Sequence, residues 1–516
     1  MHVAASLPQG DGGEELLASH LERPLARGHR PRDAFTGAAG GAACGDLVRI
    51  SIALAADGED GRIADAGFDA SGCGAAIAAG SAAVGLVRGA SLLDAARVGA
   101  RDIAAELGGL SAAKQHAAEL AADALHRALG AAARASSPLA PNPRRTLVAM
   151  SGGVDSAVAA LLLARSGRQA VGVTLELWSP EGDAAGGAEQ SCCSAQAVRG
   201  ARELAHELGM PHLSIDLRAE FRAGVVERWL ADHADGLTPN PCVRCNGSVR
   251  LDAMLELART LGSETLATGH YARVAPPCDP GEHEHAGPLL RTAADERKDQ
   301  SYVLAALAPS SLARLRFPLG DMHKAQVREL ARREGLSVAR KRESQDLCFL
   351  AGTRQRDFLA RHGGLARRPG SILDERGHSL GEHAGAHAYT VGQRRGLGVS
   401  APVSASASAP SGGPLYVLAT DTRANTITVG PREALLTARL QLREVTLHRP
   451  GSHVDGVRVR AHGRLQRCRL ADAPVLAAGS HRALAVELER PAERTAPGQL
   501  ACLYRGELVV GHGTIA

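Results

Sequence analysis

The pattern of apolar and polar positions first indicates a compact α+β unit near the N-terminus. Apolar and polar residues alternate over 47–54 and 63–68, which is the period of a half-buried β-strand. Three helical patterns follow, beginning near Ala75, Ser91 and Ser111. We expect one domain over residues 33–130, preceded by a disordered tail over residues 1–32 because that segment is polar and Gly-rich.

A second unit follows a linker. Residues 131–145 have the small, polar and Pro-containing composition of a linker. From Thr146 onward, short apolar runs alternate with helical patterns. Because strands that alternate with helices form parallel sheets, we assign residues 146–350 to an α/β domain with a doubly wound parallel sheet.

The pattern changes again after Leu350, where the helical periodicity fades. We expect a central domain over residues 351–430, which contains a low-complexity loop at 402–414. Apolar and polar positions then alternate up to the C-terminus. This alternation predicts a small C-terminal β-barrel over residues 431–516.

The composition is that of an ordinary globular protein, with 45% hydrophobic and 22% charged residues in 516. Since no run of 18 apolar residues occurs, we expect no membrane span and no membrane partner. The first residues carry acids where a secretory signal needs a basic flank and an apolar run. We therefore expect a cytoplasmic protein.

The net charge of +4 identifies no partner, but the charge is unevenly distributed. Residues 431–516 contain 13 Arg and no Lys against 8 acidic residues. Arginine suits planar recognition of phosphate groups. The same pattern also fits a solvated strand surface, so charge alone leaves both interpretations open.

A Gly-rich loop, Ser151-Gly152-Gly153-Val154-Asp155-Ser156, lies between an apolar strand and an apolar helix. Two glycines let the backbone approach a ligand closely, and the amides at a helix start favour an anion. The loop lacks the Gly-Lys-Ser/Thr ending of a Walker loop, which disfavours a γ-phosphate-transferring ATPase. We predict a phosphate site here.

The ten cysteines suggest reactive thiols or metal ligands, because a cytosolic chain rarely uses disulfides as a framework. Cys245 and Cys348 each lie in a polar segment next to basic residues, which lower the pKa of a thiol. Although about a hundred positions separate them, they could meet over one nucleotide site. Cysteines buried by chance remain the alternative.

The Gly-rich loop resembles the pyrophosphate loop of the N-type ATP pyrophosphatases, which adenylate a substrate and release pyrophosphate. Taken with other segments in the same order, the chain from about residue 145 to 516 resembles the tRNA-specific 2-thiouridylase (MnmA) family. GMP synthetase, which shares the loop, would need an amidotransferase domain that the sequence lacks. The segments are SGGVDS (151–156), SCCS (191–194), NPCVRCN (240–246), ATGHYAR (267–273), KDQSYVL (298–304), SQDLCFL (344–350) and YTVGQRRGLG (389–398).

The resemblance implies an adenine nucleotide alpha hydrolase-like fold and a role for individual residues. Contacts with ATP are implied for Ala149, Met150, Ser151, Gly152, Gly153, Val154, Asp155, Ser156, Leu175 and Gly269. Contacts with tRNA are implied for Asn240, Pro241, Cys242, His270, Lys298, Asp299, Gln300 and Gln499, with Arg460 as a weaker candidate. The catalytic pair is implied to be Cys348, the persulfide carrier, and Cys245, the thiol that releases the sulfur.

By resemblance, the enzyme uses ATP with Mg²⁺ to adenylate the C2 oxygen of the wobble uridine, which a soft persulfide sulfur then displaces. A cysteine desulfurase or another persulfide donor is the implied partner besides tRNA. Many family members have Asp where this chain has Cys242. The cysteines at 242, 245 and 348 could therefore hold an iron–sulfur cluster instead, and we keep both routes.

The N-terminal unit resembles iron–sulfur scaffold proteins of the NifU/IscU type. Cys44, Asp46, Cys73 and His116 match their cluster ligands, whereas the third cysteine is replaced by Ala117. This loss argues against cluster assembly, but the remaining set suits Zn²⁺. A degenerate docking domain is the alternative for this unit. A rival for the whole chain is an iron–sulfur carrier in which the ATPase half is regulatory.

Overall fold

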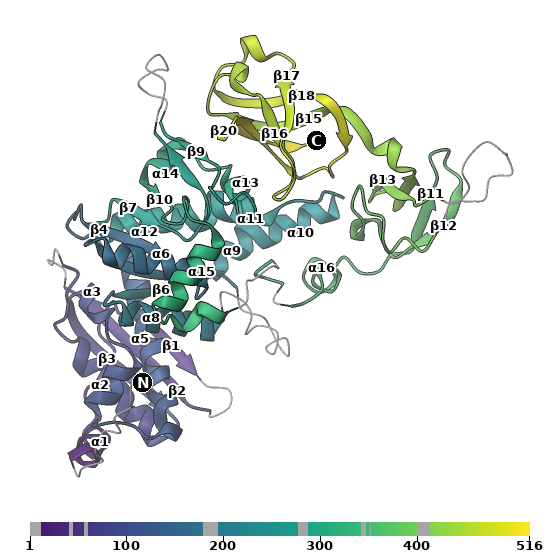
Figure 1. Cartoon of the computed structure of the whole chain (residues 1–516). Coiled ribbons are helices and arrows are strands. Elements are labelled where there is room, and N and C mark those ends of the chain that lie inside the picture. The colour runs from purple at the N-terminus through teal and green to yellow at the C-terminus, as the bar shows by residue number, and fades with distance from the viewer. Residues whose placement is uncertain are drawn as a thin grey trace.

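The computed structural model describes residues 12–40, 45–55, 60–178, 194–276, 287–341, 347–350, 352–399 and 413–516. Figure 1 shows the N-terminal domain at one end, the α/β domain in the middle, and two β-rich domains beyond it. No helix in these described ranges is both long and apolar enough to cross a bilayer.

The N-terminal domain is a three-stranded antiparallel sheet covered by helices on one face. Its strands, in the spatial order β1-β2-β3, are Phe35–Gly40, Leu47–Leu54 and Ile63–Ser71. Its helices are α2 (Gly74–Val87), α3 (Leu92–Ala95), α4 (Ala100–Glu106) and α5 (Gln115–Ala135). The alternating Val48, Ile50 and Ile52 are fully buried under these helices, which confirms the α+β character expected from the sequence.

The expected disordered tail over residues 1–32 is wrong for part of its length. Residues 12–22 form helix α1 (Gly12–Glu22), which packs on α2. The Ser81 hydroxyl holds the following turn, because it accepts the Leu25 amide at 2.8 Å and lies 2.8 Å from His20 Nδ1. Polar composition hid this helix, whose order comes from contacts with the domain, among them the packing of Leu17 against the core.

The α/β domain contains a five-stranded parallel sheet in the order β10-β7-β4-β5-β6. The strands are β4 (Arg145–Ala149), β5 (Gln169–Glu176), β6 (His212–Asp216), β7 (Thr265–Ala267) and β10 (Leu315–Arg316). The first strand is central, and successive strands add to one side and then to the other. This is the predicted doubly wound topology, and its switch point lies between β4 and β7.

The helices of this domain lie between and beyond the strands. They are α6 (Val154–Arg165), α8 (Ala195–Glu207), α9 (Arg218–Phe221), α10 (Glu227–Ala234), α11 (Pro241–Arg244), α12 (Leu251–Thr260), α13 (Ser301–Leu304), α14 (Pro309–Arg314) and α15 (Lys324–Arg333). The hairpin of β8 (Arg273–Ala275) and β9 (Leu289–Arg291) leaves the sheet and pairs with the C-terminal barrel through β20.

Two β-rich domains follow α16 (Gln355–Gly363). The central one has the strand order β12-β11-β14-β13 (Ser379–His383, Gly370–Leu373, Thr426–Gly430 and Tyr416–Asp421). In the other, β15 (Leu436–Leu447) pairs with both β18 (Gly479–Glu493) and β20 (Leu508–Ile515), which closes the predicted barrel. The remaining barrel strands are β16 (Gly456–Arg458), β17 (Gln466–Leu470) and β19 (Leu500–Arg505).

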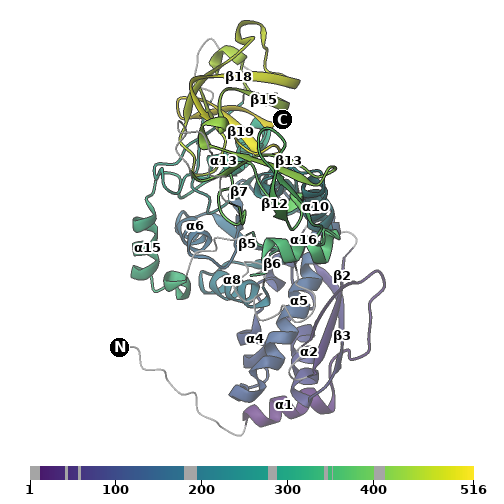
Figure 2. The same ribbon diagram turned by 90° about the vertical axis from the view of Figure 1, so that its right-hand side faces the viewer.

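Helix α5 fixes the N-terminal domain against the α/β domain, as both views show (Figures 1 and 2). It continues to Ala135, into the segment expected to be a linker, and packs on the edge strand β6. Asp123 of α5 accepts hydrogen bonds from Arg199 and Arg202 of α8, each at 2.8 Å. The two domains therefore share one hydrophobic core instead of being joined by a flexible tether.

Helix α5 and strand β6 approach so closely at Gly130 that only glycine fits. A Cβ there would lie 1.9 Å from the Ser214 carbonyl oxygen. We expect Gly130→Ala to lower the melting temperature, because the two backbones must separate at a cost of about 1–3 kcal/mol. Gly200→Ala in α8, where a Cβ meets nothing within 4 Å, is the matched control and should stabilise by up to ~1 kcal/mol. An equal or higher melting temperature for Gly130→Ala would contradict this account of the interface.

Candidate functional site

The Gly-rich loop joins β4 to α6 at the switch point of the sheet, where ligands of such sheets bind. Ser156 Oγ donates to the Gly153 carbonyl and accepts the Ser151 amide, both at 3.1 Å, which curls the loop around the helix start. Gly152 has φ +66°, and a Cβ there would lie 2.7 Å from the Ala197 oxygen. The first amides of α6 face the loop without a side-chain cap, as an anion site requires.

Asp155 does not stand alone in this loop. Its carboxylate accepts hydrogen bonds from both sides: Lys324 Nζ lies 2.7 Å from each oxygen, and the Tyr271 hydroxyl donates at 2.8 Å. Lys341 Nζ donates to the Gly152 carbonyl at 2.9 Å. Two ammonium groups thus reach the loop from outside, and they supply the cation that the loop sequence itself lacks.

We did not predict Lys324 and Lys341 from the sequence, although a signal was present. The chain has only four lysines, at 114, 298, 324 and 341, among 59 basic residues. Although nearly all its other basic residues are arginine, the chain has lysine at 324 and 341, the two positions whose ammonium groups contact the loop. A compact ammonium acts as a point charge, which a planar guanidinium does not replace.

The other residues expected at the ATP site differ in exposure. Gly269 follows β7, and a Cβ there would lie 2.7 Å from the Ser156 amide, so its backbone touches the loop. Ala149, Met150 and Leu175 are buried at the ends of their strands. Their side chains belong to the core, so any contact with a ligand at this edge of the sheet must come from their backbones.

Two of the residues expected to contact tRNA hold the site together from within. Gln300 accepts the Tyr271 amide at 2.8 Å, and Tyr271 in turn contacts Asp155. His270 lies 2.8 Å from the Thr268 hydroxyl, and burial lowers its pKa to about 3, so the imidazole is neutral at physiological pH.

Asp299 lies in the seam between the α/β domain and the barrel. Its carboxylate accepts the Ala293 amide at 3.0 Å, the Ser301 hydroxyl at 2.8 Å and Arg458 Nη1 at 2.6 Å. The side chain is only 3% exposed. Geometry gives Asp299 a joining role, and the same holds for Gln499, whose side chain donates to the Thr238 carbonyl.

The segment that carries Cys242 and Cys245 begins just after Thr238, whose carbonyl accepts the hydrogen bond from Gln499. Asn240 caps α11, because its side-chain oxygen accepts the Cys242 amide at 3.1 Å, and Cys245 begins a π-helical segment that runs to Arg250. Cys242, Cys245 and Cys348 are each half-buried. Such exposure leaves a thiol accessible, unlike Cys502, where burial raises the pKa to about 12.

Cys348 is positioned by its neighbour in the chain. The Phe349 ring packs edge-on against Trp229 and Phe358, with ring centroids 5.2 Å apart in each case. Cys348 and Cys245 pack against the same hydrophobic core. Part of the SQDLCFL motif, together with Cys192, Cys193 and Cys278, lies outside the described residues.

Three of the four expected N-terminal ligands do meet. The ligand atoms of Asp46, Cys73 and His116 lie within 4.8 Å of one another. Cys73 Sγ donates to Asp46 Oδ2 at 3.1 Å, and His116 Nε2 lies 3.0 Å from the same oxygen. Cys44 lies outside the described residues, and Ala117 is fully buried in the core.

The electrostatics of this cluster suit a cation. Burial raises the pKa of the Asp46 carboxyl, but hydrogen bonds from Cys73 and His116 outweigh it, so the pKa lies below its ordinary value. Burial and the neighbouring carboxylate raise the pKa of the Cys73 thiol. His116 Nδ1 lies 2.9 Å from the Ala113 carbonyl, which directs Nε2 at the cluster as an outer partner of a metal ligand does.

Four family models match successive parts of the chain. Residues 14–135 match the NifU-like N terminal domain, and residues 144–352 match the tRNA methyl transferase HUP domain. Residues 356–431 match the tRNA methyl transferase PRC-barrel domain, and residues 449–515 match the aminomethyltransferase beta-barrel domain.

Two relatives show how far the similarity extends. The Bifunctional protein NifU/MnmA of Rubrobacter xylanophilus is 41% identical over 513 residues, which covers 97% of this chain and 98% of that protein. The tRNA-specific 2-thiouridylase MnmA of Roseiflexus castenholzii is 40% identical and covers 72% of this chain and 99% of its own length. The chain therefore belongs to the MnmA family of tRNA-specific 2-thiouridylases and carries a NifU-like domain at its N-terminus.

Proposed function

We propose that this protein thiolates the C2 position of the wobble uridine of tRNA, using ATP to activate the base and a cysteine persulfide to supply sulfur. The observation that carries the proposal is that one domain holds both a phosphate loop contacted by two lysines and the half-buried Cys242, Cys245 and Cys348. The tRNA-specific 2-thiouridylases that the chain resembles over residues beyond its N-terminal domain support the same chemistry.

In the first step, the uridine C2 oxygen attacks the α-phosphorus of ATP, and pyrophosphate leaves. The amides at the start of α6 and the ammonium groups of Lys324 and Lys341 are suited to stabilise the charge that develops on the leaving pyrophosphate. Asp155 holds Lys324 in place through both carboxylate oxygens. Mg²⁺ on the ATP phosphates would share this task.

In the second step, the terminal sulfur of a Cys348 persulfide attacks C2, and AMP leaves with the former C2 oxygen. The Cys245 thiolate attacks the inner sulfur of Cys348 and breaks the S–S bond of the persulfide. The products are 2-thiouridine, AMP and a Cys245–Cys348 disulfide. A thiol reductant must then reduce this disulfide, and a cysteine desulfurase or another persulfide donor must reload Cys348.

For the N-terminal domain we propose a single Zn²⁺ held by Asp46, Cys73 and His116, with a fourth position for Cys44 or an external ligand. The mixed carboxylate, thiolate and imidazole set, with its ligand atoms within 4.8 Å, fits a tetrahedral site for this ion. The bound cation would lower the pKa of Cys73. Ala117 in place of a third cysteine is the reason for preferring one ion to a cluster.

The phosphate loop can be tested through its lysine. Lys324→Met should slow tRNA-dependent pyrophosphate release by about 10²-fold or more while tRNA affinity stays unchanged, because it removes a charge at the leaving group. Asp155→Ala should act in the same direction. Arg332→Met, which removes an exposed charge from the same helix, is the control and should have no effect. Normal pyrophosphate release by Lys324→Met and Asp155→Ala would refute the assignment of the ATP site.

The cysteine roles predict stalls at different steps. Cys348→Ser should adenylate tRNA but accept no labelled sulfur, whereas Cys245→Ser should carry the label on Cys348 without releasing it. Alkylation and peptide mass spectrometry distinguish the two states. Cys242→Ser should still load sulfur on Cys348. If instead all three variants lose an iron chromophore and activity together, the sulfur passes through an iron–sulfur cluster.

The metal site is tested with the full chain and Co²⁺, whose bond to a thiolate gives a near-ultraviolet band. We expect one ion per chain, and an affinity in Asp46→Asn that is weaker by at least the roughly 10- to 100-fold that loss of an outer partner costs, because Asp46 is itself a ligand. Asp69→Asn, which changes an exposed acid on the same sheet, should bind normally. Anaerobic reconstitution of a stable, stoichiometric cubane cluster in this domain would contradict the proposal.

A further inference from the structure

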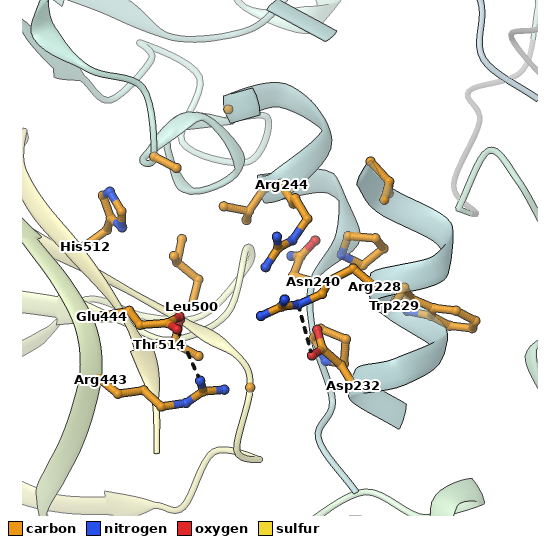
Figure 3. Close-up of a pocket in the computed structure, with 17 residues that line it drawn as sticks. Arg228, Trp229, Asp232, Asn240, Arg244, Arg443, Glu444, Leu500, His512 and Thr514 are labelled. Carbon is orange, nitrogen blue, oxygen red and sulfur yellow. Dashed lines mark ion pairs between the residues drawn. The ribbon is translucent and has the colours of Figure 1, made fainter. Parts of the chain in front are cut away.

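A cavity of about 370 Å³ lies between the α/β domain and the C-terminal barrel, apart from the phosphate loop. Figure 3 shows its two walls: helices α10 and α11 on one side, strands β15 and β20 on the other. Asn240 and Pro241, next to Cys242, form part of the α11 wall. Its volume is within the range of small-molecule and nucleotide sites, about 300–1,000 Å³.

Three guanidinium groups converge on this cavity from separate elements: Arg228 of α10, Arg244 of α11 and Arg443 of β15 (Figure 3). All three act on one carboxyl, that of Asp232. Burial raises the pKa of Asp232, and the charges of these arginines oppose the rise. Arg228 pairs with Asp232 at 3.7 Å and Arg443 pairs with Glu444 at 3.6 Å (Figure 3). The two arginine side chains are 54% and 37% exposed, so a ligand can reach them but must compete with these carboxylates.

The barrel wall of the cavity is built at a cost in backbone strain. Glu444 has φ +51°, a left-handed conformation that a residue with a Cβ rarely adopts. The pairing of β15 with β20 shifts register between Arg443 and Thr446 at the same place. In a regular strand, neighbouring side chains point to opposite faces, yet Arg443 and Glu444 both line the cavity. Such strain persists where the surrounding structure requires it, and here it aims Arg443 inward.

Apart from the three arginines and the carboxylates of Asp232 and Glu444, the lining is neutral. Burial lowers the pKa of His512 to about 4, so this imidazole carries no charge at physiological pH. Gly498, with φ +89°, brings the barrel against the segment before Asn240, where a Cβ would lie 2.9 Å from Leu237 Cβ. The Thr238 amide also donates to the Pro497 carbonyl at 2.8 Å. The two walls are thus held together beside the cysteine segment.

We propose that this cavity binds one nucleotide of the single-stranded tRNA loop next to the target uridine, with its phosphate held by Arg228, Arg244 and Arg443. The inference rests on the proposed tRNA function and deepens it by naming a subsite. Planar guanidinium groups recognise phosphate oxygens in pairs, and the neutral part of the lining accommodates a ribose and a base. Because its walls come from two domains, an occupied cavity fixes the barrel relative to Asn240.

The test measures tRNA affinity at several salt concentrations for Arg443→Met, Arg228→Met and wild type. Each substitution should weaken binding and reduce the slope of log affinity against log salt by about 0.7, the value for one contact with a single-stranded phosphate. Arg469→Met, which removes a 78% exposed arginine from the outside of the barrel, should leave affinity and slope nearly unchanged. Melting temperatures verify that each variant is folded.

The outcomes separate the subsite from the function. If wild type binds and thiolates tRNA while Arg443→Met and Arg228→Met keep the wild-type affinity and slope, the subsite is refuted and the function stands. If wild type binds no tRNA, the proposed function fails first. Binding of inorganic phosphate or of polyglutamate that depends on these arginines, with tRNA affinity unaffected, would also overturn the proposal, because the cavity would then serve another anion.

Discussion

The buried ion pair between Asp299 and Arg458 joins the α/β domain to the C-terminal barrel. The position of the barrel relative to the segment that carries Cys242 and Cys245 depends on this contact. The carboxylate is 3% exposed and takes hydrogen bonds from a backbone amide, a serine hydroxyl and the guanidinium. Around it, Ser301 meets the Tyr504 hydroxyl at 3.0 Å, and Tyr302 donates to the Leu500 carbonyl at 2.8 Å. Removing one partner of a buried ion pair lowers the stability by about 3–5 kcal/mol, so separating the two domains at this seam is unfavourable.

The N-terminal domain is held with comparable firmness, though by packing. Helix α5 buries one face on its own sheet and another on β6, so that both domains contribute to one core. A fusion of this kind keeps the Asp46–Cys73–His116 cluster at a constant place relative to the catalytic domain. Among the described residues, the interface between the two domains is a continuous packed core, so they are held as one unit.

Local pattern and spacing predicted much of the fold. Strand 47–54, the phosphate loop after the first parallel strand and the C-terminal barrel all depend on periodicity or on a short motif, and the structure has each of them. Helix α1 was missed because its order comes from contacts with α2. The same reason explains Lys324 and Lys341: they lie about 170 and 190 positions from the loop, and only the tertiary fold brings them to it.

Motif matching also assigned Asp299 and Gln499 to tRNA contact, which stays a prediction, and in the structure both side chains make hydrogen bonds across the domain seam. A sequence cannot distinguish a polar residue that faces a ligand from one that satisfies buried groups at a domain seam, since both occur in polar motifs. The cavity between α10, α11 and the barrel could not be predicted from the sequence for another reason. It depends on a left-handed residue in a strand, which no residue type at 444 indicates.

The central claim is that this chain places sulfur on the wobble uridine of tRNA, and nucleoside mass spectrometry tests it most directly. Transfer RNA from cells that lack the gene should contain unmodified C2 at this position, and a copy of the wild-type gene should restore 2-thiouridine. An Asp155→Ala copy should restore none. Normal 2-thiouridine in the tRNA of the deletion strain, with no second enzyme of this family present, would contradict the account.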